Sequence, residues 1–146
     1  MSIYLPVIQG IYTALASAVR TVSQTIVGRD LIDPKNADPR FSTTINAEAS
    51  GLIAYCNVTA APGVETLQLV LEEQDPASGT WSQVTATTAT TVAGMIKLKV
   101  KPSIAAVAAS VSGVTIQDIL PATWRLRVVH SGAGNWTYSL GIILYG

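Results

Sequence analysis

The two segments that decide the fold lie near the C-terminal end of the chain: Trp124-Arg-Leu-Arg-Val-Val-His130 and Trp136-Thr-Tyr-Ser-Leu-Gly-Ile-Ile-Leu-Tyr145. Apolar and polar residues alternate along both, which is the period of a β-strand with one buried face. The residues between them, Ser131-Gly-Ala-Gly-Asn135, include two glycines and suit a short reversal of the chain. The pattern predicts a β-hairpin in which His130 pairs with Trp136.

In this hairpin the apolar side chains of both strands share one continuous face. We expect that face to form the centre of the protein core, with the rest of the chain covering it. The residues that carry it are Trp124, Leu126, Val128, Trp136, Tyr138 and Leu140.

The composition is unusual in its shortage of charge. At 146 residues the chain is long enough for one domain with a sizeable core, so it needs neither a disulfide nor a metal ion to fold. Charged residues make up 12% of the chain, about half the usual fraction. We therefore expect copies of the chain or a partner protein to cover part of its surface.

The balance of charge argues against a general nucleic-acid binder. Nine basic residues balance nine acidic ones, whereas proteins that bind nucleic acid through its backbone carry a basic excess. The partner is therefore expected to be a protein.

The N-terminal segment is uncharged until Arg20. A signal peptide carries positive charge before its apolar run, and a membrane span is not interrupted as Pro6 and Gly10 interrupt this one, so we expect neither. We expect residues 1–28 to be an arm, extended or partly helical, that docks on another subunit by pairing its backbone as well as its side chains. Its large apolar residues are Ile3, Tyr4, Leu5, Val7, Ile8, Ile11, Tyr12 and Leu15.

Residues 29–40 form a charged connector with two Asp-Pro pairs, which suit turns and extended backbone. Its aspartates Asp30, Asp33 and Asp38 lack the alternate spacing of a calcium loop, so a solvated turn is favoured over a metal site. This divides the chain into an arm and connector, residues 1–40, and a sandwich domain, residues 41–146.

Residues 41–146 read as a series of strands. Alternation predicts strands at 41–46, 51–59, 67–72 and 96–100, whereas 84–94 could be strand or loop and 103–117 a short helix or a surface loop. Together with the hairpin they predict an all-β fold, an antiparallel β-sandwich of the jelly-roll or immunoglobulin-like type with seven or eight strands. Lys97, Lys99 and Lys101 share one side of their strand. They could bind an acidic partner or phosphates, but we favour protection of an exposed strand from wrong pairing.

Groups for catalysis are scarce. The single cysteine and the single histidine exclude a Cys/His zinc site, and the glycines near residue 132 precede a strand instead of the helix that a phosphate site needs. We interpret Cys56 as a core residue, and His130 as a hydrogen-bonded strand-end residue in preference to a pH sensor. We therefore predict no enzyme, no cofactor and no metal.

Three segments together resemble a family of small structural proteins of tailed-bacteriophage virions, of the head decoration or auxiliary capsid type. They are Asp75-Pro-Ala-Ser-Gly-Thr-Trp81, Leu120-Pro-Ala-Thr-Trp-Arg-Leu-Arg-Val-Val-His130 and Tyr138-Ser-Leu-Gly141. The resemblance implies a β-sandwich on the capsid surface, present in many copies and bound to the major capsid protein. It carries over no site residues, because the matching positions determine the fold.

Two alternatives stay open beside the decoration protein. One is a tail-associated structural protein, because such sandwiches occur in both parts of a virion. The other is a carbohydrate-binding or adhesin-like module that would use Tyr55, Trp81 or Tyr145 as its platform. A sugar binder needs at least two exposed rings on one face, so the direction of these side chains distinguishes the classes.

Overall fold

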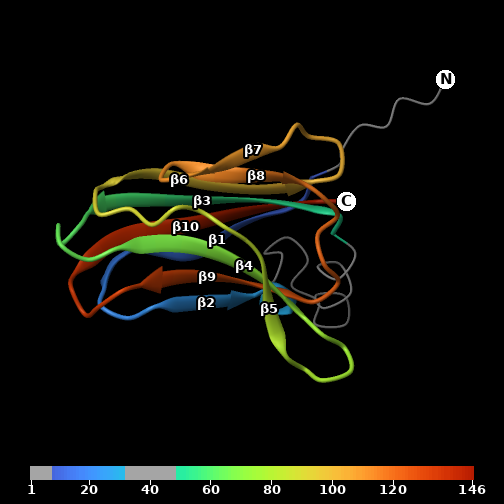
Figure 1. Ribbon diagram of the computed structural model, residues 1–146, viewed down its shortest axis with the longest axis horizontal. Helices are drawn as coiled ribbons and strands as arrows, with labels where there is room; N and C mark the ends of the chain where they lie inside the picture. Colours follow the sequence, from blue (N-terminus) through green and yellow to red (C-terminus); the bar gives the residue numbers. More distant parts are fainter. Residues whose placement is uncertain (1–7, 32–48) are drawn as a thin grey trace.

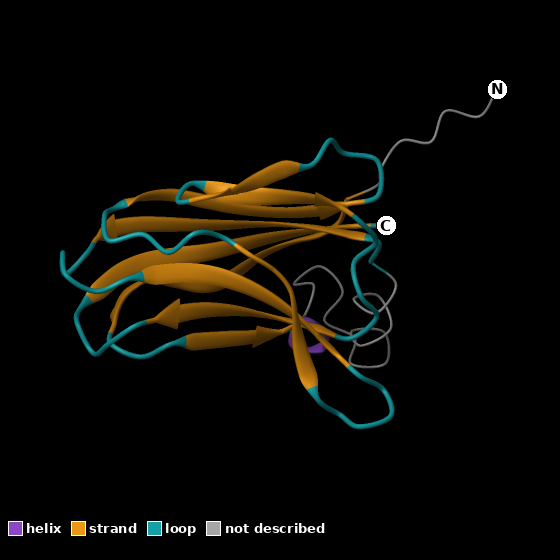
Figure 2. Ribbon diagram, viewed as in Figure 1, coloured by secondary structure: helices purple, strands orange, loops and turns teal. Residues whose placement is uncertain are grey.

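The computed structural model describes residues 8–31 and 49–146, and in them the chain forms a two-layered β-sandwich (Figure 1). Figure 2 shows that strands make up nearly all of the regular structure, with one 3₁₀ turn, η1 (Gly28–Asp30). The strands are β1 (Ile8–Arg20), β2 (Gln24–Val27), β3 (Gly51–Ala60), β4 (Leu67–Gln74), β5 (Trp81–Ala86), β6 (Gly94–Lys101), β7 (Val107–Ser110), β8 (Gly113–Gln117), β9 (Trp124–His130) and β10 (Trp136–Tyr145).

Six strands form one sheet in the order β1-β10-β3-β6-β8-β7, and four form the other in the order β2-β9-β4-β5. The predicted all-β sandwich is therefore confirmed, but the described residues hold ten strands instead of the seven or eight expected. Neighbouring strands are antiparallel except β6 and β8, which run parallel. In the described part of the chain, no helix is both long and apolar enough to cross a membrane.

The predicted C-terminal hairpin is wrong in its pairing. Strand β9 lies between β2 and β4, whereas β10 lies between β1 and β3 in the other sheet. Residues 131–135 therefore cross from one sheet to the other, a separation of about 10 Å in packed sheets. Alternation reveals which side of a strand is buried, but it does not reveal which strand supplies the backbone hydrogen bonds.

The predicted core residues are nevertheless buried. Trp124, Leu126 and Val128 of β9 and Trp136, Tyr138 and Leu140 of β10 are each 2% exposed or less. They belong to the layer between the two sheets, together with Leu52, Leu69, Leu98 and other buried residues of β3, β4 and β6. The two apolar faces thus meet across the core instead of lying side by side.

The described part of the expected arm belongs to the sandwich. Strand β1 pairs with β10 along its length, and β2 pairs with β9. Both strands precede residue 41, the expected start of the sandwich domain, and yet both belong to the sandwich. Tyr12 is buried and Leu15 half-buried, whereas Ile8 and Ile11 are exposed. An uncharged, β-permissive segment suits pairing with the chain's own β10 as well as with a neighbour's sheet, and here its own sheet is the partner. The remaining arm residues Ile3, Tyr4, Leu5 and Val7, and the expected strand at 41–46, lie outside the described residues.

Strand β1 is the edge of the six-stranded sheet and carries no charge before Arg20. Its pairing with β10 shifts register three times, between Ile8 and Gly10, Thr13 and Leu15, and Leu15 and Ala18. Each shift places one extra residue on β1. Bulges of this kind distort an edge and discourage pairing with another chain, so they replace the charges that usually protect such a strand.

Residues 103–117 hold two strands where the sequence left a short helix or a surface loop open. Strands β7 and β8 extend the six-stranded sheet beyond β6. The apparent helical spacing there rested on few residues, and all four residues of β7 are exposed. The parallel pair of β6 and β8 needs glycine at its start, because a Cβ on Gly113 would collide with the carbonyl oxygen of Lys97.

Candidate interaction surface

The outer face of the six-stranded sheet is the surface best suited to binding a partner. One row of neighbouring residues crosses all six of its strands. In strand order the row is Ile11, Ile143, Ile53, Lys99, Thr115 and Val107. Ile11 is 65% exposed and Val107 59%, whereas Ile53 is covered by its neighbours. We call this surface, with Lys97, Lys101, Tyr55 and Tyr145, the outer face.

Two lysines of the outer face lie over tyrosine rings. The Lys97 ammonium lies 5.8 Å from the centre of the Tyr55 ring, and the Lys101 ammonium lies 4.2 Å from the centre of the Tyr145 ring. At such distances the ring faces attract the ammonium groups and hold the long side chains over the sheet. Burial, and to a smaller extent the neighbouring Tyr55, raises the pKa of Tyr145, so its hydroxyl is protonated at neutral pH.

The lysines of the outer face form no ion pair among the described residues; the acidic residue beside them is Asp118, just after β8, whose backbone N–H donates to the Lys101 carbonyl oxygen. None of the six strands of this sheet contains an aspartate or a glutamate. In the described part of the chain, salt bridges involve Arg125 and Arg127 with Glu72, and none involves Lys97, Lys99 or Lys101. The three positive charges are therefore free to face a negatively charged partner.

The expectation that these lysines protect an exposed strand is wrong. Strand β6 lies between β3 and β8, with backbone partners on both sides. A strand with two neighbours needs no protection from further pairing, so the lysine row requires another explanation.

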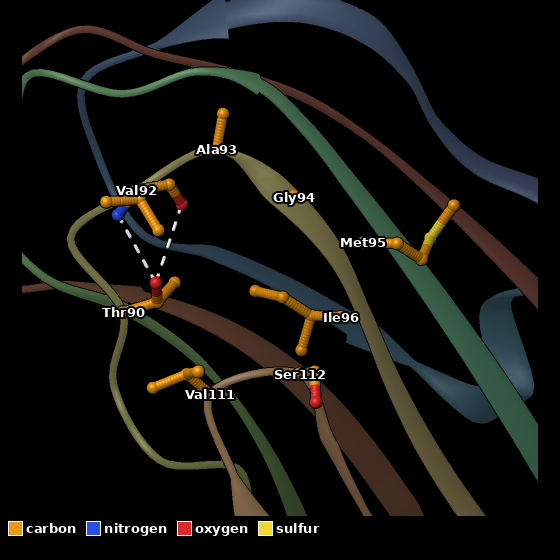
Figure 3. A pocket seen from close by; sticks show the side chains of 8 residues that line it. All are labelled: Thr90, Val92, Ala93, Gly94, Met95, Ile96, Val111 and Ser112. Atoms are coloured by element: carbon orange, nitrogen blue, oxygen red, sulfur yellow. Dashed lines mark hydrogen bonds between the residues drawn. The ribbon is translucent and has the colours of Figure 1, made fainter.

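The described residues form two small hollows, one beside the lysine row and one at the start of β6. One of about 190 Å³ is lined by Lys97, Lys99, Ser110, Thr115 and neighbouring residues of β7 and β8. The other, of about 120 Å³, is lined by both polar and apolar residues, and Figure 3 shows Val92, Ile96 and Val111 around it. Both are smaller than the pockets of about 300 Å³ or more that hold typical small-molecule ligands. They suit single side chains of a partner protein.

The outer face of the four-stranded sheet differs, because its charges are already paired. Arg125 donates a hydrogen bond of 2.9 Å from Nε to Glu72 Oε1, and its guanidinium lies 4.3 Å from the centre of the Trp81 ring. Arg127 adds a longer contact of 3.7 Å to the same carboxylate. Trp81 therefore does not share a face with Tyr55 and Tyr145.

Cys56 and the acidic residues do not form a reactive or metal-binding site in the described structure. Cys56 is fully buried between the sheets, and burial raises the pKa of its thiol to about 12, so it stays protonated. In the described ranges, no group of three His, Cys, Asp or Glu residues could hold a metal ion. Of the connector aspartates, Asp30 lies in η1, whereas Asp33 and Asp38 lie outside the described residues.

Comparisons with known proteins add little to this geometry. No protein-family model matches the chain, and no curated protein matches it. Among solved structures, the crystal structure of the Yersinia pseudotuberculosis-derived mitogen is similar, with 14% sequence identity and a TM-score of 0.44. The alignment covers 94% of this chain and 86% of that chain. At this level of similarity it supports no statement about function.

Sequence reasoning found part of the outer face. It placed the three lysines on one side of a strand and named Tyr55 and Tyr145, with Trp81, as the platform that a carbohydrate-binding module would use. It assigned Ile11 to an arm. The alternation puts Ile53 and Ile143 on the outer sides of their strands, but it did not show that they form one surface with Ile11. The signal for these isoleucines was weak, because an apolar residue on the outer side of a strand breaks the alternation by which the strand is recognised.

Proposed function

We propose that this protein is a non-enzymatic structural protein of a tailed-bacteriophage virion, which decorates the capsid by binding the major capsid protein with the outer face. The observation that carries the proposal is the row of three unpaired lysines among isoleucines and tyrosines on a sheet whose strands contain no carboxylate. The sequence resemblance supports the virion as the setting. If this chain is instead a tail-associated structural protein, it would bind an acidic surface of its neighbour with the same face.

The chemistry of the outer face suits a protein partner. Aromatic and aliphatic side chains supply most of the affinity at the centre of protein interfaces, whereas exposed charges mainly accelerate association and select the partner. Ile11, Ile143 and the tyrosine rings provide the first kind of contact, and the lysines the second. The expected partner surface is acidic and carries apolar groups that reach Ile11.

A pair of matched variants tests the proposal. Ile11 on the outer face and Val22 in the β1–β2 turn are 65% and 64% exposed, so Ile11→Glu and Val22→Glu place the same charge at equally exposed aliphatic positions. We expect Ile11→Glu to weaken binding to capsids of the same virion at least tenfold in a sedimentation assay. Val22→Glu should bind as the unmodified chain does.

The lysines are tested separately by replacing all three with glutamine. Because exposed charges act mainly on association, the rate at low salt should fall, and the difference should shrink as salt screens the charges. If Ile11→Glu and the triple lysine variant both bind capsids normally at every salt concentration, the outer face is not the attachment surface.

A carbohydrate-binding function is the second candidate, because Tyr55 and Tyr145 share one face and each has a lysine over its ring. That arrangement suits an acidic sugar. A glycan array with the unmodified chain, Tyr145→Ala and, as a control on the other sheet, Trp81→Ala distinguishes the candidates. Binding that Tyr145→Ala removes and Trp81→Ala keeps would favour the sugar.

A further inference from the structure

His130 and Tyr138 join the two sheets by a buried hydrogen bond. His130 is the last residue of β9 in the four-stranded sheet, and Tyr138 belongs to β10 in the six-stranded sheet. His130 Nε2 and the Tyr138 hydroxyl are 2.9 Å apart, and the two rings meet edge to face with centres 5.6 Å apart. The core between the sheets consists mainly of apolar side chains, so this hydrogen bond is a directional link within it.

The link lies at the end of the sandwich where the chain crosses repeatedly between the sheets. The connections β1–β2, β3–β4 and β9–β10 all cross there, at the left in Figure 1. The backbone N–H of His130 donates to Ser23 Oγ at 3.0 Å, and that of Gly134 donates to Glu65 Oε2 at 2.7 Å. These three connections are therefore tied to the residues around His130; the β5–β6 connection crosses at the same end, where Thr90 pairs with Leu67.

Two buried polar atoms beside this link have no hydrogen-bond partner in the described part of the chain: His130 Nδ1 and Trp136 Nε1. The two rings are neighbours, with centres 6.2 Å apart. An indole N–H can only donate a hydrogen bond, whereas Nδ1 of a neutral imidazole can offer a lone pair. In the neutral tautomer with its proton on Nε2, the imidazole donates to the Tyr138 hydroxyl and Nδ1 keeps a lone pair. Protonation adds an N–H at Nδ1, so this group and the Trp136 indole N–H would both lack an acceptor among the described residues.

The charged groups around His130 come from two other elements. Arg20, the last residue of β1, donates from Nη1 to the Tyr138 carbonyl oxygen at 2.5 Å, and its guanidinium lies 4.9 Å from the centre of the Tyr138 ring. Glu65 belongs to the β3–β4 connection, and the residue of β4 paired with His130 is the apolar Leu67. A second positive charge would therefore lie near Arg20, with Glu65 as the counter-charge.

We propose that His130 and Tyr138 form a pH-sensitive clasp, which holds this end of the sandwich closed at neutral pH and loosens it in mildly acidic solution. Loosening would free the three crossing connections while the apolar core between the sheets persists. The proposal does not depend on the partner of the outer face, because the clasp lies inside the sandwich.

Burial of the imidazole agrees with this direction. Burial lowers the pKa of His130 from its ordinary value near 6.5; Glu65 raises it and Arg20 lowers it to smaller extents. Because the folded protein then binds the proton less well than the unfolded chain, the stabilisation is complete above pH 6.5 and is lost as the pH falls below that value.

The experiment uses the fact that His130 is the single histidine of the chain. Its imidazole resonance can be followed by NMR from pH 8 to pH 4.5, and we expect a midpoint below 6.5. His130→Gln is the comparison variant, because its amide nitrogen can replace Nε2 toward Tyr138 but takes up no proton. Below the ordinary histidine pKa, the folding equilibrium constant of the unmodified chain should fall by up to about tenfold per pH unit relative to the variant.

Hydrogen exchange measured by mass spectrometry locates the effect. At pH 5.5, exchange in residues 61–66 and 131–135 should be faster in the unmodified chain than in His130→Gln at the same pH, with β6 and β8 unchanged. Parallel stability profiles of the two proteins, or an imidazole that titrates at 6.5 or above, would overturn the clasp. If His130→Gln does not fold, the NMR titration of the unmodified chain decides the question.

Discussion

At the scale of single residues, the tryptophans illustrate how one side chain can determine local packing. Trp124 fills the space beside η1, where a Cβ on Gly28 would collide with the indole ring. Trp136 is fully buried at the start of β10. Trp81 is half-buried and lies over Arg125 on the outer surface of the four-stranded sheet. The three residues have the same side chain, but their replacement by alanine should lower the free energy of unfolding by different amounts.

We therefore expect Trp136→Ala to lower the free energy of unfolding by about 3–5 kcal/mol, because the core cannot collapse onto so large a cavity. Trp81→Ala, which removes a partly solvated ring, should cost about 1 kcal/mol. Urea denaturation of both variants measures the difference. Equal losses would show that Trp136 is not the central packing residue that its burial indicates.

At the scale of elements, the parallel pair of β6 and β8 depends on a glycine. Gly113 has φ +155° and lies against the carbonyl of Lys97, whereas Gly94 has nearly the same φ, +154°, and has nothing within 4 Å of the Cβ position. The two glycines therefore differ in available space but hardly in backbone strain. They allow the close approach of β8 to be measured separately from its backbone conformation.

Gly94→Ala should cost about 1–3 kcal/mol, because alanine rarely adopts that backbone conformation. Gly113→Ala should cost about 1–3 kcal/mol more, because the methyl group must displace backbone that cannot move easily. Thermal unfolding of the two variants provides the comparison. If both are destabilised equally, β8 has room to shift away from β6, and the hollow beside Lys97 and Lys99 is not rigidly shaped.

At the scale of the whole molecule, the first strand decides whether the chain has a separate arm. Strand β1 covers the edge of β10, buries Tyr12 and brings Arg20 to the Tyr138 carbonyl. The low overall charge is then a property of a sandwich with one broad outer face whose strands contain no carboxylate, and not of an arm that docks elsewhere. The outer face contains Ile11 because β1 is part of the sheet.

A chain that begins at Thr21, just after β1, should therefore lose cooperative unfolding. Its β10 edge would expose unpaired backbone groups along a buried, apolar strand, which favours aggregation over folding. Circular dichroism during heating compares it with the full chain. A truncated chain that melts at the same temperature as the full one would restore the arm expected from the sequence.

The sequence by itself determined which side of each major strand is buried. Alternation placed Trp124, Leu126 and Val128 with Trp136 and Tyr138 in the core. The Asp-Pro-Ala-Ser-Gly sequence of residues 75–79 is typical of a turn closed by a left-handed residue, and Gly79 has a φ of +75°. These features are local, because side-chain direction repeats every two residues and turn residues act on their own backbone.

Only the tertiary structure decided which strands are neighbours. The separation of β9 from β10, the interior position of the lysine strand β6 and the membership of β1 in the sheet all depend on backbone hydrogen bonds between distant segments. Backbone groups are the same in every residue, so pairing leaves little trace in the sequence. The outer face and the contact between His130 and Tyr138 across the sheets exist only once that pairing is set, which is why the sequence contained their residues but not their arrangement.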